Sequence, residues 1–373
     1  MKKALIVDWF DKYGGAERVI GNLEKAFSFD ITYTLINIML PEYFIKIFPK
    51  ETSIIKETWL KKLKKNFRVL FFTFHYFIRS IKIDKDVSII ISSSHAVAKG
   101  VKKSNPNQLH ISYFQARNFN YIWSDLELYF GKLRFFAYPL IAILRKIDVS
   151  HSVNPDFIIS NSLFVKRWVK EKYNRESDVI YPPVDLSKFS LETQKEEYYV
   201  AVGRLVYVKR FDIAIKAFNG LNKKLIIIGD GDQSEIFKKM ASDNIVFKGF
   251  LDSEEVAHYV QKAKGFIQTG VEGFGIASIE AQACGTPVIA FGKGGVLETV
   301  IDNQTGIFFN EQTAESLKDA ITIFEKKTFE PSKVRQNALQ FSSERFEKEM
   351  KLYVDTKWSE HIQKIKHDKR KQK

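Results

Sequence analysis

Short apolar runs alternate with amphipathic stretches along most of the chain. In the first half, β-branched runs of four to six residues between polar breaks predict buried strands; they are Ala4–Asp8, Ile31–Ile36, Val87–Ser92, Leu109–Tyr113 and Phe157–Ser160. Helical patterns lie between several of them, such as Ala16–Phe27 and Leu163–Tyr173. This alternation of strand and helix predicts a parallel sheet with helices on both faces.

The same alternation restarts at Tyr198. The expected strands of this second series are Tyr199–Gly203, Lys224–Gly229, Ile245–Lys248, Gly265–Gln268, Pro287–Ala290 and Ile307–Phe309. The expected helices are Phe211–Phe218, Gln233–Met240, Ser253–Lys262, Ala277–Cys284 and Thr313–Glu325. A second doubly wound parallel sheet is therefore predicted, and the fold class is α/β with two Rossmann-like domains.

A proline pair separates the two series. The segment YPPVD at residues 181–185 cannot continue a helix or a central strand, and a polar stretch follows it. The predicted organisation is a first domain at 1–184, a linker at 185–197 and a second domain at 198–340. A helix at 341–366, expected to cross back to the first domain, and a basic tail at 367–373 complete it.

Composition narrows the class of protein. Of the 373 residues, 45% are hydrophobic and 27% are charged, which is typical of globular proteins. Cys284 is the single cysteine, so an internal disulfide framework is excluded and a reducing compartment is favoured. Neither a signal peptide nor a run of about 20 apolar residues is visible. We therefore expect a cytoplasmic protein, peripheral on the inner face of the cell membrane.

The net charge of +14 is unevenly distributed: residues 1–180 carry +12, residues 181–363 carry −3 and the last ten carry +5. A basic first half suits an anionic ligand or surface, although a general preference for lysine would give the same excess. Lys56–Lys82 holds eight basic residues, one acid and interleaved aromatic residues. This pattern predicts an interfacial helix on anionic lipid; the alternative is a core-packed helix with a solvated basic face.

Ligands of open parallel sheets bind in the loops that follow the strands, so these loops hold the candidate site. Gly14-Gly15 follows the first strand, and we expect it to adopt positive φ and approach an anion at a helix N-terminus. Arg204 and Lys209 follow the first strand of the second series and suit a diphosphate. Glu272 and Glu280 flank a glycine-rich helix entry; we expect Glu280 to be buried.

These motifs together resemble the retaining glycosyltransferases of the GT-B fold, family 4. The segments that carry the resemblance are GRLVYVKRFD (203–212), IIIGDG (226–231), FKGFL (247–251) and EGFGIASIEAQACGTPVIAF (272–291). The family's Glu-x7-Glu signature is met by Glu272 and Glu280. SSSHAVAKG at 92–100 is similar to the WbaZ-like mannosyltransferases of O-antigen and capsule assembly. One segment departs from those relatives: residues 113–123, YFQARNFNYIW, lack their histidine and proline.

The resemblance implies roles for particular residues. Arg204 and Lys209 would hold the diphosphate, Glu272 the sugar hydroxyls and Glu280 the ribose, with His95 near the sugar and the acceptor. Further donor-binding positions would be Gly14, Gly15, Gly203, Gly249, Phe250, Gly273, Phe274, Gly275 and Ile276. The acceptor side would include Gln115, Arg117, Tyr121 and Trp123.

The resemblance also implies the chemistry. The expected donor is a nucleotide-sugar, with GDP-mannose first, and the expected acceptor is a lipid-linked oligosaccharide of a bacterial surface polysaccharide. No cofactor or metal is expected, because Arg204 and Lys209 supply the positive charge. No carboxylate nucleophile is evident near His95, which favours a front-side internal-return mechanism.

Other functions remain open from the sequence. A UDP-sugar donor keeps the fold, and so does a nucleotide-sugar epimerase or a phosphorylase, although no pyridoxal-binding lysine is evident. A nucleic-acid-binding protein would use the basic first half, but no recognition motif supports it and we expect no nucleic-acid partner. An inactive scaffold in polysaccharide assembly is the third alternative.

Overall fold

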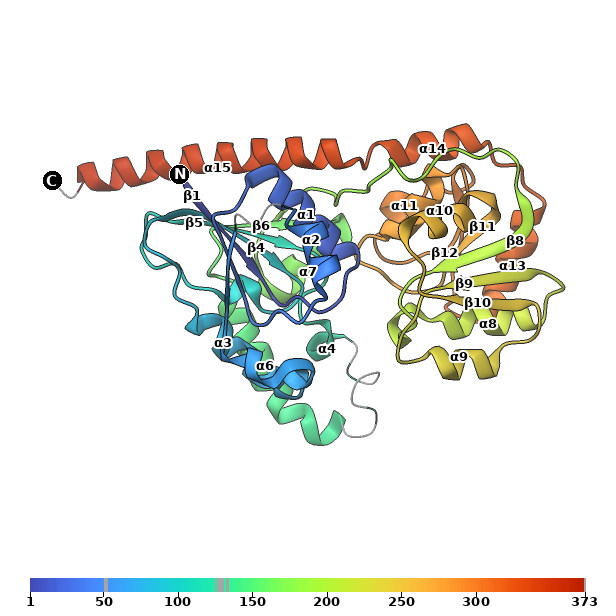
Figure 1. Ribbon diagram of the computed structural model, residues 1–373, viewed down its shortest axis with the longest axis horizontal. Coiled ribbons are helices and arrows are strands. Elements are labelled where there is room, and N and C mark those ends of the chain that lie inside the picture. The colour runs from blue at the N-terminus through green and yellow to red at the C-terminus, as the bar shows by residue number, and fades with distance from the viewer. Residues whose placement is uncertain (50–52, 125, 127–130, 132–133, 372–373) are drawn as a thin grey trace. The chain divides into compact units, whose positions relative to one another are not determined.

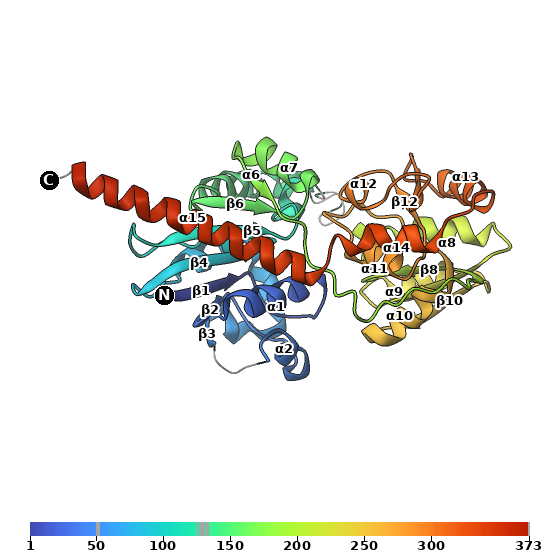
Figure 2. The ribbon, with the colours of Figure 1, turned by 90° about the horizontal axis from the view of Figure 1, so that it is seen from above.

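The computed structural model describes residues 1–49, 53–124, 126, 131 and 134–371. The chain divides into two compact units, which are Met1–Pro183 with Glu344–Lys373, and Val184–Ser343. Each unit is built on one parallel sheet, as Figures 1 and 2 show. The predicted pair of parallel α/β domains is thereby confirmed.

The first unit holds a seven-stranded sheet in the order β3-β2-β1-β4-β5-β6-β7. Its strands are β1 (Lys2–Val7), β2 (Ile31–Thr34), β3 (Ile54–Glu57), β4 (Val87–Ser94), β5 (Leu109–Phe114), β6 (Phe157–Ser160) and β7 (Asp178–Val179). Its helices are α1 (Gly15–Phe27), α2 (Pro41–Ile47), η1 (Trp59–Thr73), α3 (Phe74–Ser80), η2 (Ala98–Gly100), α4 (Asn120–Trp123), α6 (Arg134–His151), α7 (Leu163–Tyr173) and α15 (Ser343–Lys371). The strand order changes direction between β1 and β4, which makes their carboxyl ends the switch point of this sheet.

Alternate residues of β1 fill two separate cores. Ala4 and Ile6 pack with residues of η1, α3 and α6, whereas Leu5 and Val7 pack with residues of α1 and α2 on the other face. Successive side chains of a strand point to opposite faces, so a continuous apolar run is needed when both faces are covered. This explains why the buried strands were recognisable as unbroken apolar runs.

The last helix, α15, belongs to the first unit. Its residues Phe346, Met350 and Val354 are spaced four apart and are buried in the core that contains Leu5 and Val7. Figures 1 and 2 show α15 running beside α1. One helical stripe of apolar residues is sufficient to hold it there.

The second unit holds a six-stranded sheet in the order β10-β9-β8-β11-β12-β13. Its strands are β8 (Glu196–Val202), β9 (Lys224–Ile228), β10 (Ile245–Gly249), β11 (Ala263–Gln268), β12 (Val288–Phe291) and β13 (Gly306–Phe309). Its helices are η4 (Tyr207–Lys209), α8 (Phe211–Asn219), α9 (Ser234–Met240), α10 (Ser253–Lys262), α11 (Ile276–Ala283), α12 (Val296–Thr299), α13 (Ala314–Glu325) and α14 (Pro331–Leu339). The switch point lies between β8 and β11.

The segment Lys56–Lys82 does not form the single helix that its pattern predicts. Its first two residues end β3, and the rest is the 3-10 helix η1, interrupted at Lys64 (φ 49°) and Leu70, followed by α3. Leu60, Phe67 and Phe74 are buried in the core under the sheet. Core packing at these positions overrides the helical periodicity of the segment, and Phe74 in particular is not part of an exposed apolar surface.

Among the described residues, no helix has the length and apolar character needed to cross a lipid bilayer.

Candidate functional site

The site residues of the first unit are organised around a buried carboxylate. Asp8 follows β1 directly and its side chain is fully buried. Its two oxygens accept hydrogen bonds from the backbone amides of residues 95–98, at N···O distances of 2.7, 2.9, 2.6 and 2.6 Å. Several donors must replace the water around a buried carboxylate, and here one loop supplies four. Asp8 therefore fixes the loop after β4, which carries His95.

His95 lies in this loop with 31% of its side chain exposed. Its Nδ1 is 3.2 Å from Asp8 Oδ2, and its ring packs edge-on against Trp9 at a centroid distance of 4.4 Å. With the hydrogen bond running from Nδ1–H to the carboxylate, the lone pair of the neutral ring is on Nε2. The structure thus places an oriented imidazole at the switch point of the first sheet, where such sheets bind ligands.

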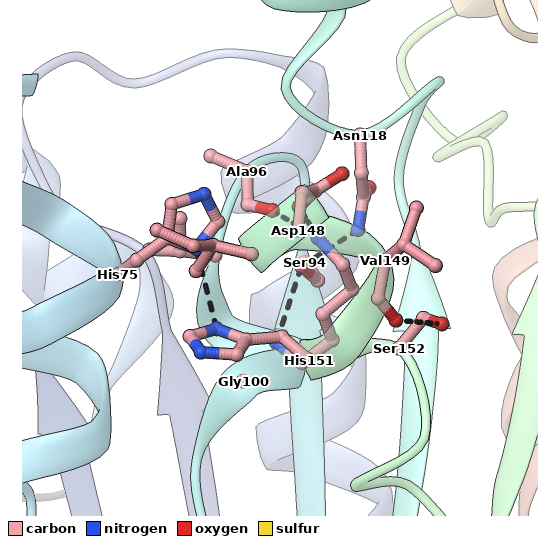
Figure 3. A network of polar contacts seen from close by, with 12 residues as sticks. His75, Ser94, Ala96, Gly100, Asn118, Asp148, Val149, His151 and Ser152 are labelled. Atoms are coloured by element: carbon pink, nitrogen blue, oxygen red, sulfur yellow. Dashed lines mark hydrogen bonds and ion pairs between the residues drawn. The ribbon is translucent and has the colours of Figure 1, made fainter. Parts of the chain in front are cut away.

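A second buried carboxylate holds the far end of the same loop (Figure 3). Lys99 and Asp148 are both fully buried, and Lys99 Nζ lies 2.6 Å from Asp148 Oδ1 and 2.7 Å from the carbonyl oxygen of Ala96. The other Asp148 oxygen accepts hydrogen bonds from Trp123 Nε1 at 2.9 Å and from the Tyr173 hydroxyl at 2.6 Å. An ion pair that is isolated from water persists when its remaining hydrogen-bonding groups are satisfied, as they are here.

Two buried histidines lie beside this pair (Figure 3). His75 of α3 and His151 at the end of α6 face each other with 3.2 Å between their Nδ1 atoms. A side chain at Gly100 would bring Cβ within 2.5 Å of the His151 ring, so the ring occupies the space that this glycine leaves. Burial, with the nearby charge of Lys99, lowers the pKa of His75 to about 3. Burial lowers the pKa of His151 to about 3, and the neighbouring His75 and Lys99 contribute smaller effects in the same direction.

The first unit should therefore lose stability in acid. An unfolded histidine has a pKa of about 6.5, so between about pH 6.5 and pH 3 the unfolded chain binds protons that the folded chain does not. Stability falls with pH in this window by up to about 1.4 kcal/mol per pH unit for each histidine. Urea unfolding can be followed at pH 7 and 4.5 by tryptophan fluorescence, since all five tryptophans belong to the first unit.

His75→Gln is expected to reduce the difference in unfolding free energy between the two pH values by about 2–3 kcal/mol. His258→Gln is the matched control, because His258 is an exposed histidine of α10 in the second unit. An unchanged pH dependence in His75→Gln would contradict this assignment.

The Gly14-Gly15 turn differs from its expectation. Neither glycine has positive φ, and Gly14 is an extended N-cap residue (φ −160°) without a side-chain capping bond. Gln115 Nε2 donates to Ser93 Oγ at 2.9 Å and to the carbonyl of Ala16 at 3.4 Å, which ties the end of β5 to the first turn of α1. An extended N-cap needs no special backbone conformation, so what the glycines provide is an entry to α1 without side chains.

The other residues expected on the acceptor side contact side chains of the first unit. The Arg117 guanidinium lies over the Phe164 ring at 5.3 Å, and the Arg145 guanidinium lies over the Trp123 ring at 5.4 Å. The indole of Trp123 is also hydrogen-bonded to Asp148, as described above. The side chain of Tyr121 lies outside the described residues.

In the second unit, two candidate residues that are 63 positions apart form an ion pair. Lys209 Nζ lies 2.6 Å from Glu272 Oε1, and the two side chains are 25% and 23% exposed. Lys209 ends η4 in the connection after β8, and Glu272 lies in the connection after β11. Because β8 and β11 are neighbours at the switch point, their two loops meet at one edge of the sheet. This edge carries a small pocket to which both residues contribute.

Backbone packing holds Lys209 in place. Thr269 Oγ1 donates to the carbonyl oxygens of Lys209 at 3.0 Å and Arg210 at 2.8 Å. A Cβ at Gly270 would lie 2.8 Å from Lys209 Cα, so a side chain at this position would push the two loops apart. On the other side, the amide of Gly295 donates to the carbonyl of Glu272 at 3.0 Å.

The other residues expected to bind the donor lie after β8 and at or within α11. Arg204 is exposed, two residues beyond the end of β8. Glu280 is 4% exposed within α11, so its expected burial is confirmed. Gly275 is the N-cap of α11 with φ +96°, a conformation that favours glycine, and the Ile276 side chain is half-buried.

The side chain of Phe274, in the glycine-rich segment, is directed into the unit. The Phe274 ring is buried and packs edge-on against Phe341 at 5.4 Å, so at this position only the backbone of the 273–276 turn is available to an anion. At the ends of the neighbouring strands β8 and β9, the Gly203 amide donates a hydrogen bond to the carbonyl oxygen of Ile228 at 3.0 Å. The Gly249 carbonyl accepts from the Gly229 amide at 2.7 Å, and Phe250 is 63% exposed.

Sequence reasoning missed the residues that hold the loops. Asp8, Lys99, Asp148 and Thr269 were not singled out, although each contacts a loop of the candidate site. Asp8 had a usable signal, since a charged residue directly after a buried apolar strand needs polar partners. Among the described residues, no three His, Cys, Asp or Glu side chains gather in an arrangement that would hold a metal ion.

Comparison with known proteins shows what the second unit is similar to. Residues 185–341, less than half of the chain, match the family described as glycosyl transferases group 1. Among solved structures, sucrose-phosphate synthase of Thermosynechococcus elongatus covers 96% of this chain and 100% of its own with a TM-score of 0.71 and 16% identity. HepE of Anabaena, in complex with UDP, covers 95% and 100% with a TM-score of 0.67 and 15% identity. At these identities the likeness shows the fold alone, which is consistent with GT-B.

Curated relatives match shorter parts. An uncharacterized glycosyltransferase of Methanocaldococcus jannaschii is 30% identical over 180 residues, which cover 46% of this chain and 50% of the relative. A GDP-mannose-dependent alpha-(1-6)-phosphatidylinositol monomannoside mannosyltransferase of Mycolicibacterium smegmatis is 28% identical over 194 residues, 42% of this chain and 51% of the relative. The chain thus spans about half the length of these relatives.

Proposed function

We propose that this protein is a retaining glycosyltransferase of family 4 that transfers a hexose from a nucleotide-sugar to a saccharide acceptor. The observation that carries the proposal is the Lys209–Glu272 ion pair at the switch point of the second sheet, inside the segment that matches glycosyl transferases group 1. An ammonium at this edge suits a diphosphate whose negative charge grows as the glycosidic bond breaks. The neighbouring carboxylate suits hydroxyl groups of the sugar.

The residue roles in this proposal are those that the resemblance to family 4 implies. Lys209 and Arg204 hold the diphosphate and stabilise it as the leaving group, and Glu272 accepts hydrogen bonds from sugar hydroxyls. Glu280, buried in α11, accepts from the ribose. His95, oriented by Asp8, acts near the transferred sugar and the acceptor. Front-side internal return accounts for retention, and no metal is needed because the two cations carry the charge.

Mannose from GDP-mannose is the first candidate, and a lipid-linked saccharide of a bacterial surface polysaccharide is the acceptor. The SSSHAVAKG motif and the similarity to a GDP-mannose-dependent mannosyltransferase support this choice. A UDP-sugar is the second candidate donor, because the structurally similar HepE binds UDP.

Donor binding tests the proposal. Calorimetric titration with GDP, UDP and ADP and with their sugars, in EDTA, should show binding of one nucleotide class, reduced in Arg204→Ala and Glu280→Ala. Selective binding of GDP and GDP-mannose would support mannose, and selective binding of UDP would replace it with a UDP-sugar. If no nucleotide binds, the enzymatic proposal fails and a scaffold role in polysaccharide assembly takes its place.

We also propose that residues 56–82 contact the anionic inner face of the cell membrane. Lys61, Lys62, Lys64 and Lys65 are exposed, as are the side chains of Trp59, Val69, Phe72 and Tyr76. Cations and aromatic residues exposed on one short segment suit the headgroup region of a bilayer, each cation contributing about 1 kcal/mol.

Membrane contact is expected to depend on these lysines. Changing the four lysines of η1 to Gln should abolish co-sedimentation with vesicles of anionic lipid at low salt. Changing Lys223, Lys224, Lys238 and Lys239 of the second unit removes the same charge and should leave sedimentation unchanged. Equal losses in the two variants would show a general charge effect and contradict a role for residues 56–82.

A further inference from the structure

One buried amide at the switch point of the second unit has a hydrogen-bond donor that the protein does not use. Gln268 is the last residue of β11 and only 6% of it is exposed. Within the described part of the chain, its Nε2 has no hydrogen-bond partner. A buried N–H group without a partner loses free energy relative to its state in water, so its retention calls for a cause.

The position of Gln268 indicates that cause. Its side chain lines the pocket to which Lys209, Glu272 and Ala277 also contribute. Its amide lies against Gly275, where an added Cβ would be 3.3 Å from Oε1 and 3.4 Å from Nε2. Gly275 is the N-cap of the eight-residue helix α11. The donor group therefore lies beside the N-cap of α11, in a pocket that Lys209 also lines.

The chemistry of this neighbourhood selects the ligand. The Nε2 group can only donate, the Lys209 ammonium can only donate, and a helix N-terminus presents free amides and a partial positive charge. These donors suit phosphoryl oxygens, which only accept hydrogen bonds, whereas the Glu272 carboxylate of the same pocket suits hydroxyl groups, which can donate.

We propose that Gln268 Nε2 donates a hydrogen bond to a phosphoryl oxygen of the nucleoside diphosphate in the donor, and so is a diphosphate-binding residue in addition to Lys209 and Arg204. This inference rests on the proposed function, because it takes the pocket as the place of the donor. It also explains why a polar glutamine is kept at the buried end of β11, next to the apolar residues Phe266 and Ile267.

The proposal predicts opposite effects on stability and on binding. In Gln268→Met the unsatisfied donor is gone, so the melting temperature of the free protein should stay the same or rise. The affinity for GDP or UDP, whichever the wild type binds, should fall by about 10- to 100-fold, as expected for a hydrogen bond to a charged group. Both quantities are measurable by calorimetry on the full chain without metal.

Gln282→Met is the matched control. Gln282 is also a buried glutamine, but its Nε2 donates to the carbonyl oxygens of Ser278 at 3.2 Å and Thr299 at 2.9 Å. This variant should melt at a lower temperature and keep the nucleotide affinity within about 2-fold of the wild type. The pair of variants therefore separates a ligand-binding amide from a structural one.

Gln268→Glu separates phosphoryl groups from sugar hydroxyls. A carboxylate repels a phosphoryl oxygen but accepts from a hydroxyl, so affinity for the nucleoside diphosphate should fall further than in Gln268→Met. Retained affinity in Gln268→Glu, or a loss in Gln268→Met that appears only with the nucleotide-sugar, would overturn the assignment to the diphosphate.

Two failures are distinguishable. Wild-type protein that binds no nucleotide overturns the proposed function and this inference with it. Wild-type protein that binds a nucleotide equally well after Gln268→Met overturns only the role of Gln268, as does a melting temperature lowered as much as in Gln282→Met.

Discussion

Lys209→Met is expected to lower kcat for the proposed glycosyl transfer by about 10²- to 10³-fold, the size of effect seen when one charge-stabilising group is removed from an active site. In the free protein Lys209 is paired with Glu272 at 2.6 Å, in the loops that meet between β8 and β11. Methionine keeps the length of the side chain and removes the charge that would oppose the growing charge of the diphosphate. The measurement is a radiolabelled sugar-transfer assay at saturating donor.

Stability should change little in this variant. Both partners are about a quarter exposed, and ion pairs in such positions contribute about 1 kcal/mol or less. Lys216→Met is the matched control, since Lys216 is an exposed lysine of the next helix, α8. If Lys209→Met transfers sugar as fast as Lys216→Met, the ion pair has no catalytic role and the proposed function loses its main support.

Asp8→Ala is expected to lower the unfolding free energy of the first unit by at least about 3 kcal/mol, because four buried backbone amides lose their acceptor together. Such a loss is a large fraction of the stability of a domain. Asp8→Asn should be destabilising as well, since its amide nitrogen would face backbone donors. Urea unfolding monitored by tryptophan fluorescence measures this unit selectively.

Asp86→Ala provides the comparison for Asp8. Asp86 also interacts with a distant residue, Lys2, but its side chain is 67% exposed, so a change of less than about 0.5 kcal/mol is expected. Transfer activity should be lost in Asp8→Ala even at temperatures where the chain stays folded, because the loop that carries His95 loses its anchor. An unfolding free energy within 1 kcal/mol of the wild type would contradict this role of Asp8.

Some elements could not be predicted from local pattern. The strand β3 has exposed and half-buried residues in alternation and lies at the edge of the sheet, so its apolar signal is weak. In η1, the spacing of Leu60 and Phe67 suits a helix, but core contacts broke that helix at Lys64. Pairing with β2 decided the backbone conformation of β3, and burial in the core decided that of η1; the local sequence decided neither.

The sequence by itself determined the central strands of the two parallel sheets, because a strand covered on both faces, such as β1 over Ala4–Val7, forms a continuous apolar run. It also determined that Arg204, Lys209 and Glu272 follow strands at the ligand-binding edge. Only the tertiary structure decided that Lys209 pairs with Glu272, that Asp8 binds the amides of residues 95–98 and that Gln268 Nε2 has no partner among the residues that the structure describes. The ion pair and the Asp8 hydrogen bonds join residues that are far apart in the chain. Backbone amides occur at every residue except proline, so the sequence does not mark which of them will bind Asp8. The register of the strands and the path of each loop therefore decide which groups meet, and no local sequence pattern predicts either of these.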